Sequence, residues 1–536
     1  MKKILYIILI ISAISSCKKD ILEMNPLDKL SENNVWNDQS LIELYVNSTY
    51  HAVEHGYNQT MWSSLSDETY NIHDGGAFMI QKGELSSDNA SNVTDIGDMF
   101  DYWAKAYSAI RSINIYFSKI DAAPVDAAMK TRMNAEMRFI RAFSYANLIW
   151  RYGGVPIVKN LFELGGDYSV TRSSYDDCVT YICSELDDVI AALPAKEPAS
   201  QLGRASGDAA KALKSRVLLY AASPLNNSNK DLTKWKKAAD AAGALLSADN
   251  SLNDDYQHIF MQDNNEIIFA RYFTQANSHY MHLWNGRNGS DGWGGNCPTQ
   301  NLVDDYEMVT TGKLPADPTS GYDPANPYKN RDPRFYASIL YDGAVWMGRE
   351  TETFNGGLDS PQSSIQAWNS SLTGYFLKKF IADDIPPSGS TLMPKNPYIF
   401  FRYGEILLNY AEAKFELGDE QTARTYVNMI RSRKGVNMPP ITATGDALRQ
   451  AIYHERRIEL ALEGHRFFDV RRWKIATVTE NRNLSAIKIT KLGNGSKTYE
   501  TVNLLSRNFA DKHYLLPIPY AEITRSKGTL TQNPGY

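Results

Sequence analysis

Cysteine is scarce in this 536-residue chain, which contains four. Three of them, Cys178, Cys183 and Cys297, lie well inside the sequence, and an odd number cannot all pair within one chain. Cys178 and Cys183 stand five residues apart in a helical pattern, which points their side chains to different faces. No CxxC or Cys/His spacing typical of a zinc site occurs. We therefore expect small buried thiols, without a disulfide framework or a zinc site.

Familiar catalytic motifs are missing as well. His454-Glu455 lacks the second histidine of a zinc-binding HExxH helix, and the sequence contains no GxSxG elbow and no P-loop. A formal net charge of −5 argues against nucleic acid as the main partner. Glycoside hydrolysis requires two carboxylates that flank a sugar. Asp304-Asp305 and Asp383-Asp384 are candidates, although we expect them at helix ends and in solvated turns.

One long apolar run stands at the very start of the chain. A basic patch at residues 1–3 precedes the apolar residues 4–11, and small, mostly polar residues lead to Cys17. This layout predicts a signal peptide over residues 1–16 and a lipidated cysteine at Cys17. The alternative is an ordinary signal peptide with an incidental cysteine. Residues 17–35, interrupted by Asn25-Pro26, are expected to form an extended linker.

Helical periodicity dominates two regions, residues 36–249 and 396–536. Apolar residues recur at three- and four-residue steps, and short breaks separate the segments. We expect helices from about residue 38 past residue 50, from residue 98 to about 117, and over 125–150, 174–192, 206–222, 231–247, 400–417, 421–432 and 447–463. Pairs of helices joined by short turns indicate repeats of the tetratricopeptide type.

Residues 250–395 have a different character. Helical stripes vanish, and Gly, Asn, Asp and Pro become dense, which in a compact protein is typical of a functional segment. Short strands are expected at 267–270 and 335–340. We interpret the region as a loop-rich, partly irregular ligand-binding lobe.

Tryptophans in polar, Gly-rich loops are the strongest candidates for ligand contact. A flat ring can stack on the apolar face of a sugar while polar neighbours bond the sugar hydroxyls. The alternative is that the rings fill small cores beneath the loops. The candidate ligand-binding residues are Trp62, Tyr70, His73, Trp284, Asn285, Arg287, Asp291, Trp293 and Trp346; His282 and Asn296 lie among them.

The densest charged stretch covers residues 455–473. Glu455, Glu459 and Glu463 follow one helical face, and Gly464 can end the helix. The arginines could bind an anion, but we expect them to pair with nearby carboxylates and to fix the turn against the fold.

Several of these motifs, taken in order, resemble the SusD/RagB family of outer-membrane nutrient-binding lipoproteins of Bacteroidota. The likeness begins with Ser16-Cys17 and extends over nearly the whole chain. The other segments that carry it are residues 22–26, 136–145, 152–156, 292–295, 298–304, 331–334, 402–413, 455–473, 517–519 and 533–536.

The resemblance implies a mainly α fold, in which four tetratricopeptide-like helix pairs form a scaffold for the ligand-binding lobe. It implies a non-catalytic protein, anchored in the outer membrane and facing the cell exterior, that captures oligosaccharides and closes as a lid over a TonB-dependent transporter. A peptide-binding member is the main alternative, and a surface glycosidase or a pure helical scaffold remain open. No cofactor is expected. A structural Ca²⁺ near residues 317–332 has no EF-hand spacing to support it.

Overall fold

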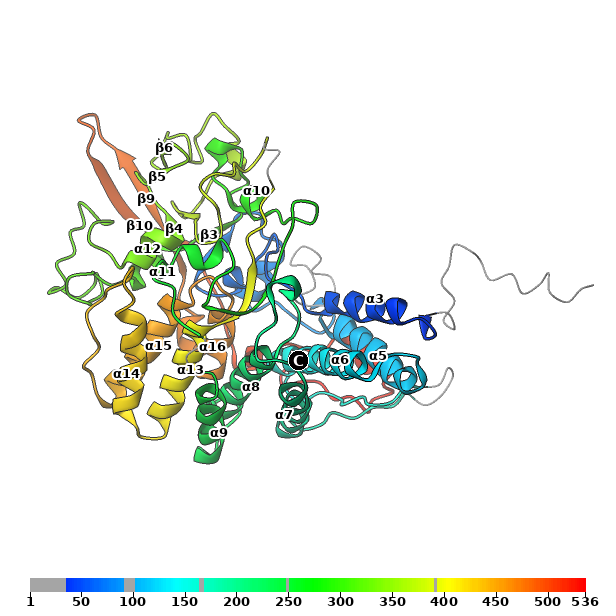
Figure 1. The fold of residues 1–536 in the computed structure, drawn as a ribbon. Helices are drawn as coiled ribbons and strands as arrows, with labels where there is room; N and C mark the ends of the chain where they lie inside the picture. The colour runs from blue at the N-terminus through cyan, green and yellow to red at the C-terminus, as the bar shows by residue number, and fades with distance from the viewer. Residues whose placement is uncertain (1–34, 91–101, 163–167, 247–249, 390–392) are drawn as a thin grey trace, which may run out of the picture.

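The computed structural model describes residues 35–90, 102–162, 168–246, 250–389 and 393–536. Figure 1 shows long helices gathered in the lower half of the molecule and loops with short elements in the upper half. The predicted signal peptide and Cys17 lie outside the described residues, as does nearly all of the predicted linker. Among the described residues, no helix has both the length and the hydropathy needed to cross a membrane.

The lower half is an array of helices that follow one another along the chain. Each helix packs against the next one in the series, and α9 packs against α13 although the lobe separates them in sequence. Within the described residues the series is α5 (Tyr102–Lys119), α6 (Ala127–Tyr152), α7 (Tyr175–Ala192), α8 (Gly207–Ala222), α9 (Leu232–Gly243), α13 (Tyr403–Glu416), α14 (Glu420–Arg431) and α15 (Gly445–Glu459). The mainly α fold expected from the sequence is confirmed, and the eight helices make four successive pairs.

Local sequence explains where these helices begin. Asp126 and Ser174 accept hydrogen bonds from backbone N–H groups of the first turns of α6 and α7, and Ser206 does so for α8. Such caps satisfy donors that have no partner inside the helix. Outside the array, α3 (Gln39–Thr49) begins where a helix was expected, with Asp38 as its cap.

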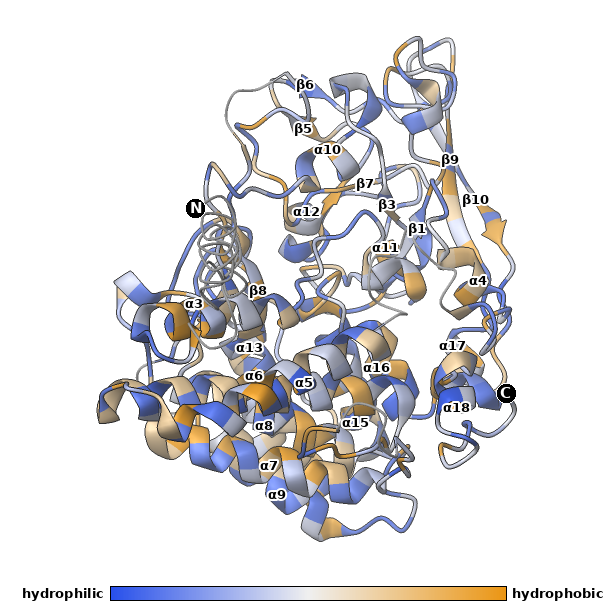
Figure 2. Ribbon diagram, turned by 90° about the vertical axis from the view of Figure 1, so that its right-hand side faces the viewer, coloured by the Kyte–Doolittle hydropathy of each residue, from blue (hydrophilic) through white to orange (hydrophobic). Residues whose placement is uncertain are grey.

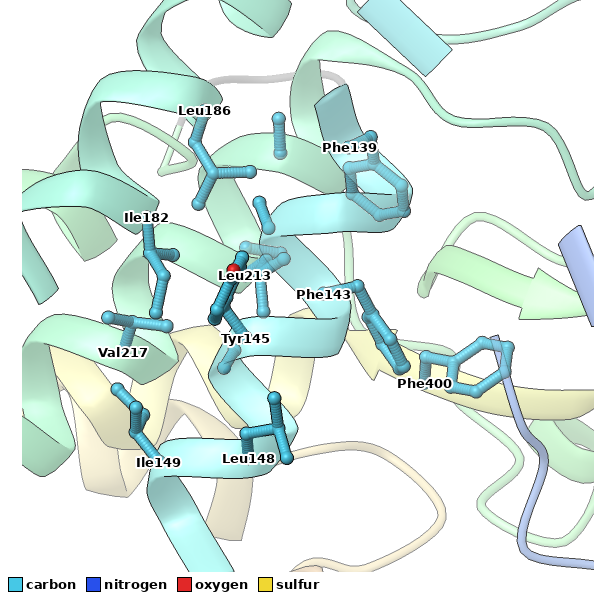
Figure 3. Close-up of a cluster of buried hydrophobic side chains, with 14 of the residues drawn as sticks. Phe139, Phe143, Tyr145, Leu148, Ile149, Ile182, Leu186, Leu213, Val217 and Phe400 are labelled. Atoms are coloured by element: carbon cyan, nitrogen blue, oxygen red, sulfur yellow. The ribbon is translucent and has the colours of Figure 1, made fainter. Parts of the chain in front are cut away.

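Helices α5 to α9 and part of α13 bury one large apolar core, and α13, α14 and α15 enclose a smaller, separate one. Figure 3 shows side chains of α6 facing those of α7 and α8, with Phe400 reaching in from strand β8 (Tyr398–Arg402). Tyr145, Ile182 and Leu213 are fully buried there. Figure 2 shows hydrophobic and hydrophilic residues alternating around the helices of the array, which is the pattern that the spacing of apolar residues predicts. Cys178 and Cys297 are buried and Cys183 is half-buried, and all three are unpaired as expected.

The upper half contains short helices and two-stranded antiparallel sheets. Its helices are α4 (Ala77–Gln81), α10 (Met281–Asn285), α11 (Gln300–Asp305) and α12 (Pro333–Ser338). The strand pairs in the described chain are β1 (Thr69–Asn71) with β3 (Asn296–Pro298), β2 (Ile267–Arg271) with β8, β4 (Ile339–Leu340) with β7 (Phe376–Leu377), β5 (Val345–Trp346) with β6 (Arg349–Glu350), and β9 (Leu484–Lys491) with β10 (Lys497–Leu505). The remaining helices, α16 (Arg466–Arg472), α17 (Ala476–Thr479) and α18 (Tyr520–Arg525), follow the array.

Two expectations for local structure are wrong. The strand expected at 335–340 is mostly helix α12, because Asp332 caps it and Pro333 occupies its first turn; only Ile339–Leu340 is extended. Helix α15 ends at Glu459 rather than at Gly464, and the following turn places Leu462 at a φ of +69°.

A buried ion-pair network joins the lobe to the array. Glu459, at the end of α15, accepts hydrogen bonds from Arg402 at 2.7 Å, Arg433 at 2.8 Å and Arg334 of α12 at 2.9 Å. Arg402 also contacts Glu266 beside strand β2 at 2.7 Å. Burial alone would raise the pKa of Glu459, but the three guanidinium groups outweigh it and lower the pKa. The arginines of residues 455–473 pair with carboxylates as expected: Arg456 with Asp469, Arg457 and Arg466 with Asp67, and Arg472 with Glu412. Arg471 instead donates to the backbone carbonyl oxygens of His513 and Phe467.

Candidate ligand-binding surface

The central tryptophan of the Gly-rich segment, Trp293, is held by a tight loop that folds back on helix α10. The backbone N–H of Trp293 donates to the carbonyl oxygen of Leu283 at 2.8 Å, and that of Gly294 donates to Gly286 at 2.9 Å. A Cβ on Gly292 would lie 2.2 Å from the carbonyl oxygen of Gly286, so this close approach requires glycine. The dense glycines therefore permit the close backbone contacts that position Trp293 on the loop.

A second loop, residues 366–370, lies directly against the first. A Cβ on Gly294 would lie 2.2 Å from the carbonyl oxygen of Asn369, so the two backbones touch at these residues. Gln366 links the loops, because its Nε2 donates to Oδ1 of Asp291 at 3.0 Å and its Oε1 accepts from Asn369 at 2.8 Å. Asp291 and Gln366 both have positive φ, +61° and +42°. Strained non-glycine residues of this kind gather at functional sites.

Each loop presents an exposed tryptophan beside the point of contact. Trp293 is 37% exposed and Trp368 is 77% exposed. Tyr280, which precedes α10, is 51% exposed, and its ring centroid lies 5.5 Å from that of the half-buried Trp284. Single exposed apolar residues are common. Exposed aromatic residues on two loops that touch, with a further aromatic pair on the adjoining α10, are a candidate for ligand contact. We call this set, Tyr280, Trp284, Trp293 and Trp368, the aromatic surface.

Polar side chains border the aromatic surface. His73 is exposed, and its Nε2 lies 2.7 Å from the carbonyl oxygen of Trp293. Asp291 is also exposed, and only its Oδ1 is engaged by a described residue. The carboxylate of Asp291 and the amide of Gln366 can accept and donate hydrogen bonds to a bound hydroxyl. The arrangement combines flat apolar rings with fixed hydrogen-bonding groups.

Three of the residues predicted to bind ligand lie inside the lobe. Asn285 is fully buried, and its Oδ1 accepts from the backbone and side chain of Asn296. Arg287 donates to the carbonyl oxygen of Trp346 at 2.7 Å and to Thr351 at 3.0 Å, and burial lowers its pKa to about 10. Trp346 is only 3% exposed. These side chains support the loops from beneath and do not reach the aromatic surface.

Trp62 and Tyr70 each pack against other aromatic rings. The half-buried ring of Trp62 lies 5.0 Å from the rings of both Phe467 and Phe468, which join it to the helical array. Tyr70 is half-buried on strand β1, with its ring 4.9 Å from that of Phe78. Of the nine predicted residues, the structure thus brings His73, Trp284, Asp291 and Trp293 together at the touching loops.

Sequence reasoning does not single out Trp368, the most exposed tryptophan of the surface. It satisfies the same criterion as the other loop tryptophans, since Gln366, Asn369 and Ser370 surround it in sequence. Its polar neighbours in the sequence could therefore have identified Trp368 as a candidate.

No group of three or more His, Cys, Asp or Glu residues in the described parts of the chain is arranged to hold a metal ion. In the Asp-rich stretch where a structural Ca²⁺ was considered, Asp317 accepts from Thr319, and Asp323 accepts from Ala325 and Asn326. These carboxylates accept hydrogen bonds from residues of their own turns.

The fold is that of a helical-repeat protein with an inserted loop-rich lobe. Residues 257–536 match the model of the SusD family, and residues 20–219 match a second model, described as starch-binding associating with outer membrane. Because the first match covers more than half of the chain, the chain belongs to the SusD family.

Known relatives resemble the chain over nearly its full length. A SusD-like protein P2 of Formosa agariphila is 25% identical, with 100% of this chain and 99% of that protein covered. A SusD-like protein of Bacteroides fragilis has a structure with a TM-score of 0.81 at 30% identity, covering 96% of this chain and all of that one. Another B. fragilis structure, titled a SusD-like carbohydrate binding protein, has a TM-score of 0.78 at 27% identity and covers 92% and 99% of the two chains.

Proposed function

We propose that this chain is a non-catalytic glycan-binding protein that captures oligosaccharides on the aromatic surface. The observation that carries the proposal is the pair of exposed tryptophans, Trp293 and Trp368, on two loops that touch at Gly294 and Asn369. The carbohydrate-binding title of the B. fragilis neighbour supports the same class of ligand.

The physical basis of capture is stacking plus hydrogen bonding. Covering one face of an indole removes roughly 80–100 Å² of apolar surface from water, which is worth about 2 kcal/mol. Asp291 and Gln366 are bonded to each other across the two loops, and His73 contacts the backbone of Trp293, so that hydrogen-bonding groups stand close to both tryptophans in the structure. Two stacking positions would favour a chain of sugars over a single one.

Binding to a panel of plant and host glycans tests this function directly. Affinity electrophoresis and calorimetry should detect at least one oligosaccharide, and Trp293→Ala and Trp368→Ala should each weaken its binding. Tyr520→Ala is a matched control, because Tyr520 is 57% exposed on α18 and its side chain makes no hydrogen bond in the described structure. Failure of every glycan, together with peptide binding, would refute the proposal in favour of a peptide-binding protein.

We further propose that the protein acts at the outer membrane, facing the cell exterior, through a lipid on Cys17. The signal-like pattern before Cys17 and the family description that mentions the outer membrane support this location. The linker after Cys17 would hold the protein close to a TonB-dependent transporter and raise its local concentration there. Cys17→Ala should release the protein from membranes. Failure of the intact protein to co-purify with such a transporter would refute the partnership.

The absence of catalysis can be tested on the same glycans. Incubation of the purified protein with a bound oligosaccharide should release no new reducing ends. Steady turnover would overturn the non-catalytic proposal and would favour a surface glycosidase.

A further inference from the structure

A cavity of about 80 Å³ lies between the helical array and the segments that follow α3 and α15, away from the touching loops of the aromatic surface. One water needs roughly 10–15 Å³ of such space, so the cavity can hold a group of several heavy atoms. Its lining includes Trp62, Tyr102, Trp150, Arg151 and His465. The proposed capture of glycans gives this cavity no role.

Arg151 is a buried cation without a carboxylate partner among the described residues. Its side chain is 5% exposed, and its guanidinium lies 4.3 Å from the ring centroid of Tyr102 and 4.8 Å from that of Trp62. The only hydrogen bonds that it makes to described residues leave from Nη1, to the backbone and side-chain oxygens of Asn147 at 2.8 Å each. Burial lowers the pKa of Arg151, and the nearby tyrosines and Glu54 offset this effect only in part.

The free edge of this guanidinium has the geometry that binds oxyanions. Nε of Arg151 is buried with no hydrogen-bond partner in the described structure, and Nη2 on the same edge makes no bond to a described residue. Two parallel N–H groups of this kind match the two oxygens of a carboxylate. The indole Nε1 of the neighbouring Trp150 is another buried donor without a partner, and Trp150 lines the same cavity. Unsatisfied buried donors cost free energy unless a ligand or water engages them.

The other charged groups of the cavity are already compensated. Glu54 contacts Lys105 at 3.2 Å, and Arg216 contacts Glu405 at 2.6 Å. The carboxylate of Glu463 accepts from Arg402 and from Lys379.

The two histidines in the lining do not add charge. Burial lowers the pKa of His55 to about 4 and that of His465 further, so both are neutral at pH 7. Arg151 is therefore the one charged side chain of the described lining that forms no ion pair with a described residue, and Glu54, which is paired with Lys105, favours its charged form only from a longer distance.

We propose that this cavity is a binding site for a small carboxylate, held bidentately by Nε and Nη2 of Arg151 with Trp150 Nε1 as a further donor. The carboxylate belongs to a free organic acid or to a sugar acid, which share this chemistry. The site is separate from the aromatic surface, and its occupancy does not depend on whether that surface binds glycans.

Thermal unfolding of the full mature chain tests the site. Sodium acetate should raise the Tm in a saturable way at constant ionic strength maintained with sodium chloride, whereas the neutral isostere acetamide should not. Arg151→Gln should abolish the rise, and Arg525→Gln should retain it, because Arg525 is an exposed arginine on α18 whose side chain is 74% accessible. Sodium glucuronate distinguishes a free organic acid from a sugar acid. If glucuronate raises the Tm at a lower concentration than acetate does, the site is assigned to a sugar acid.

No rise with acetate, or an equal rise with acetamide, would overturn the proposal. Because Arg151→Gln can also weaken folding, a crystal structure of the unaltered protein in sodium formate gives a second test. Planar density within hydrogen-bond distance of Nε and Nη2 is the expected result. Density for water alone at this edge would contradict a carboxylate site.

Discussion

Replacing Glu459 with glutamine removes one negative charge from the point where three arginines meet. The carboxylate of Glu459 contacts Arg334, Arg402 and Arg433 at 2.7–2.9 Å, and all four side chains are at least 96% buried. Removing one partner of a buried ion pair typically costs about 3–5 kcal/mol, because an uncompensated charge remains. Other carboxylates still reach these arginines, so we expect about 3 kcal/mol, a large part of a typical free energy of unfolding of about 5–15 kcal/mol.

Urea unfolding at pH 7, followed by tryptophan fluorescence and circular dichroism, measures this loss. The control is Asp240→Asn, which breaks the exposed pair of Asp240 with Lys236 on α9, whose side chains are 64% and 69% exposed. Exposed pairs contribute about 0–1 kcal/mol. If Glu459→Gln costs no more than this control, the network does not hold the lobe on the array and the reasoning fails.

The remaining predictions concern pH, binding and backbone geometry. Burial raises the pKa of Glu68 from 4.5 to about 8, although Arg457 opposes this effect. Between these two pH values the folded protein holds a proton on Glu68 that the unfolded chain has lost, so stability declines as the pH rises from 4.5 through 8. The free energy of unfolding of Glu68→Gln, relative to that of the unaltered protein, should therefore rise by up to about 1.4 kcal/mol per pH unit across that range. A Tm difference between the two proteins that stays constant with pH would contradict this. Trp368→Ala should weaken glycan binding at least about tenfold by calorimetry with no change in Tm, since its ring is 77% exposed; unchanged affinity would remove it from the site. Gly294→Ala should cost more stability than Gly343→Ala, because both residues have positive φ but only Gly294 abuts a backbone oxygen; equal Tm losses would refute that contact.

The helical array could be predicted from the sequence because its information is local. Apolar spacing and caps such as Asp126 place each helix within a few residues of its observed position. Helix α15 is an exception: Gly464 suggests its end, but the helix ends at Glu459, whose side chain contacts Arg402. That contact joins residues far apart in sequence, which periodicity does not report.

The lobe was harder to predict because long-range burial decides what each side chain does. Trp293 and Trp346 both stand in polar, Gly-rich sequence, yet the first is exposed and the second is covered by the Arg287 network. Local composition marks both rings as unusual but does not tell which one faces solvent. The β9–β10 hairpin was not expected either, since its strands carry many polar residues on their exposed faces.

The structure of the protein with a glycan identified from the binding panel tests the central claim most directly. We predict sugar rings stacked on Trp368 and Trp293, with a hydroxyl bonded to Asp291 or Gln366. An oligosaccharide bound elsewhere, with both indole rings left uncovered, would contradict the assignment of the aromatic surface as the capture site.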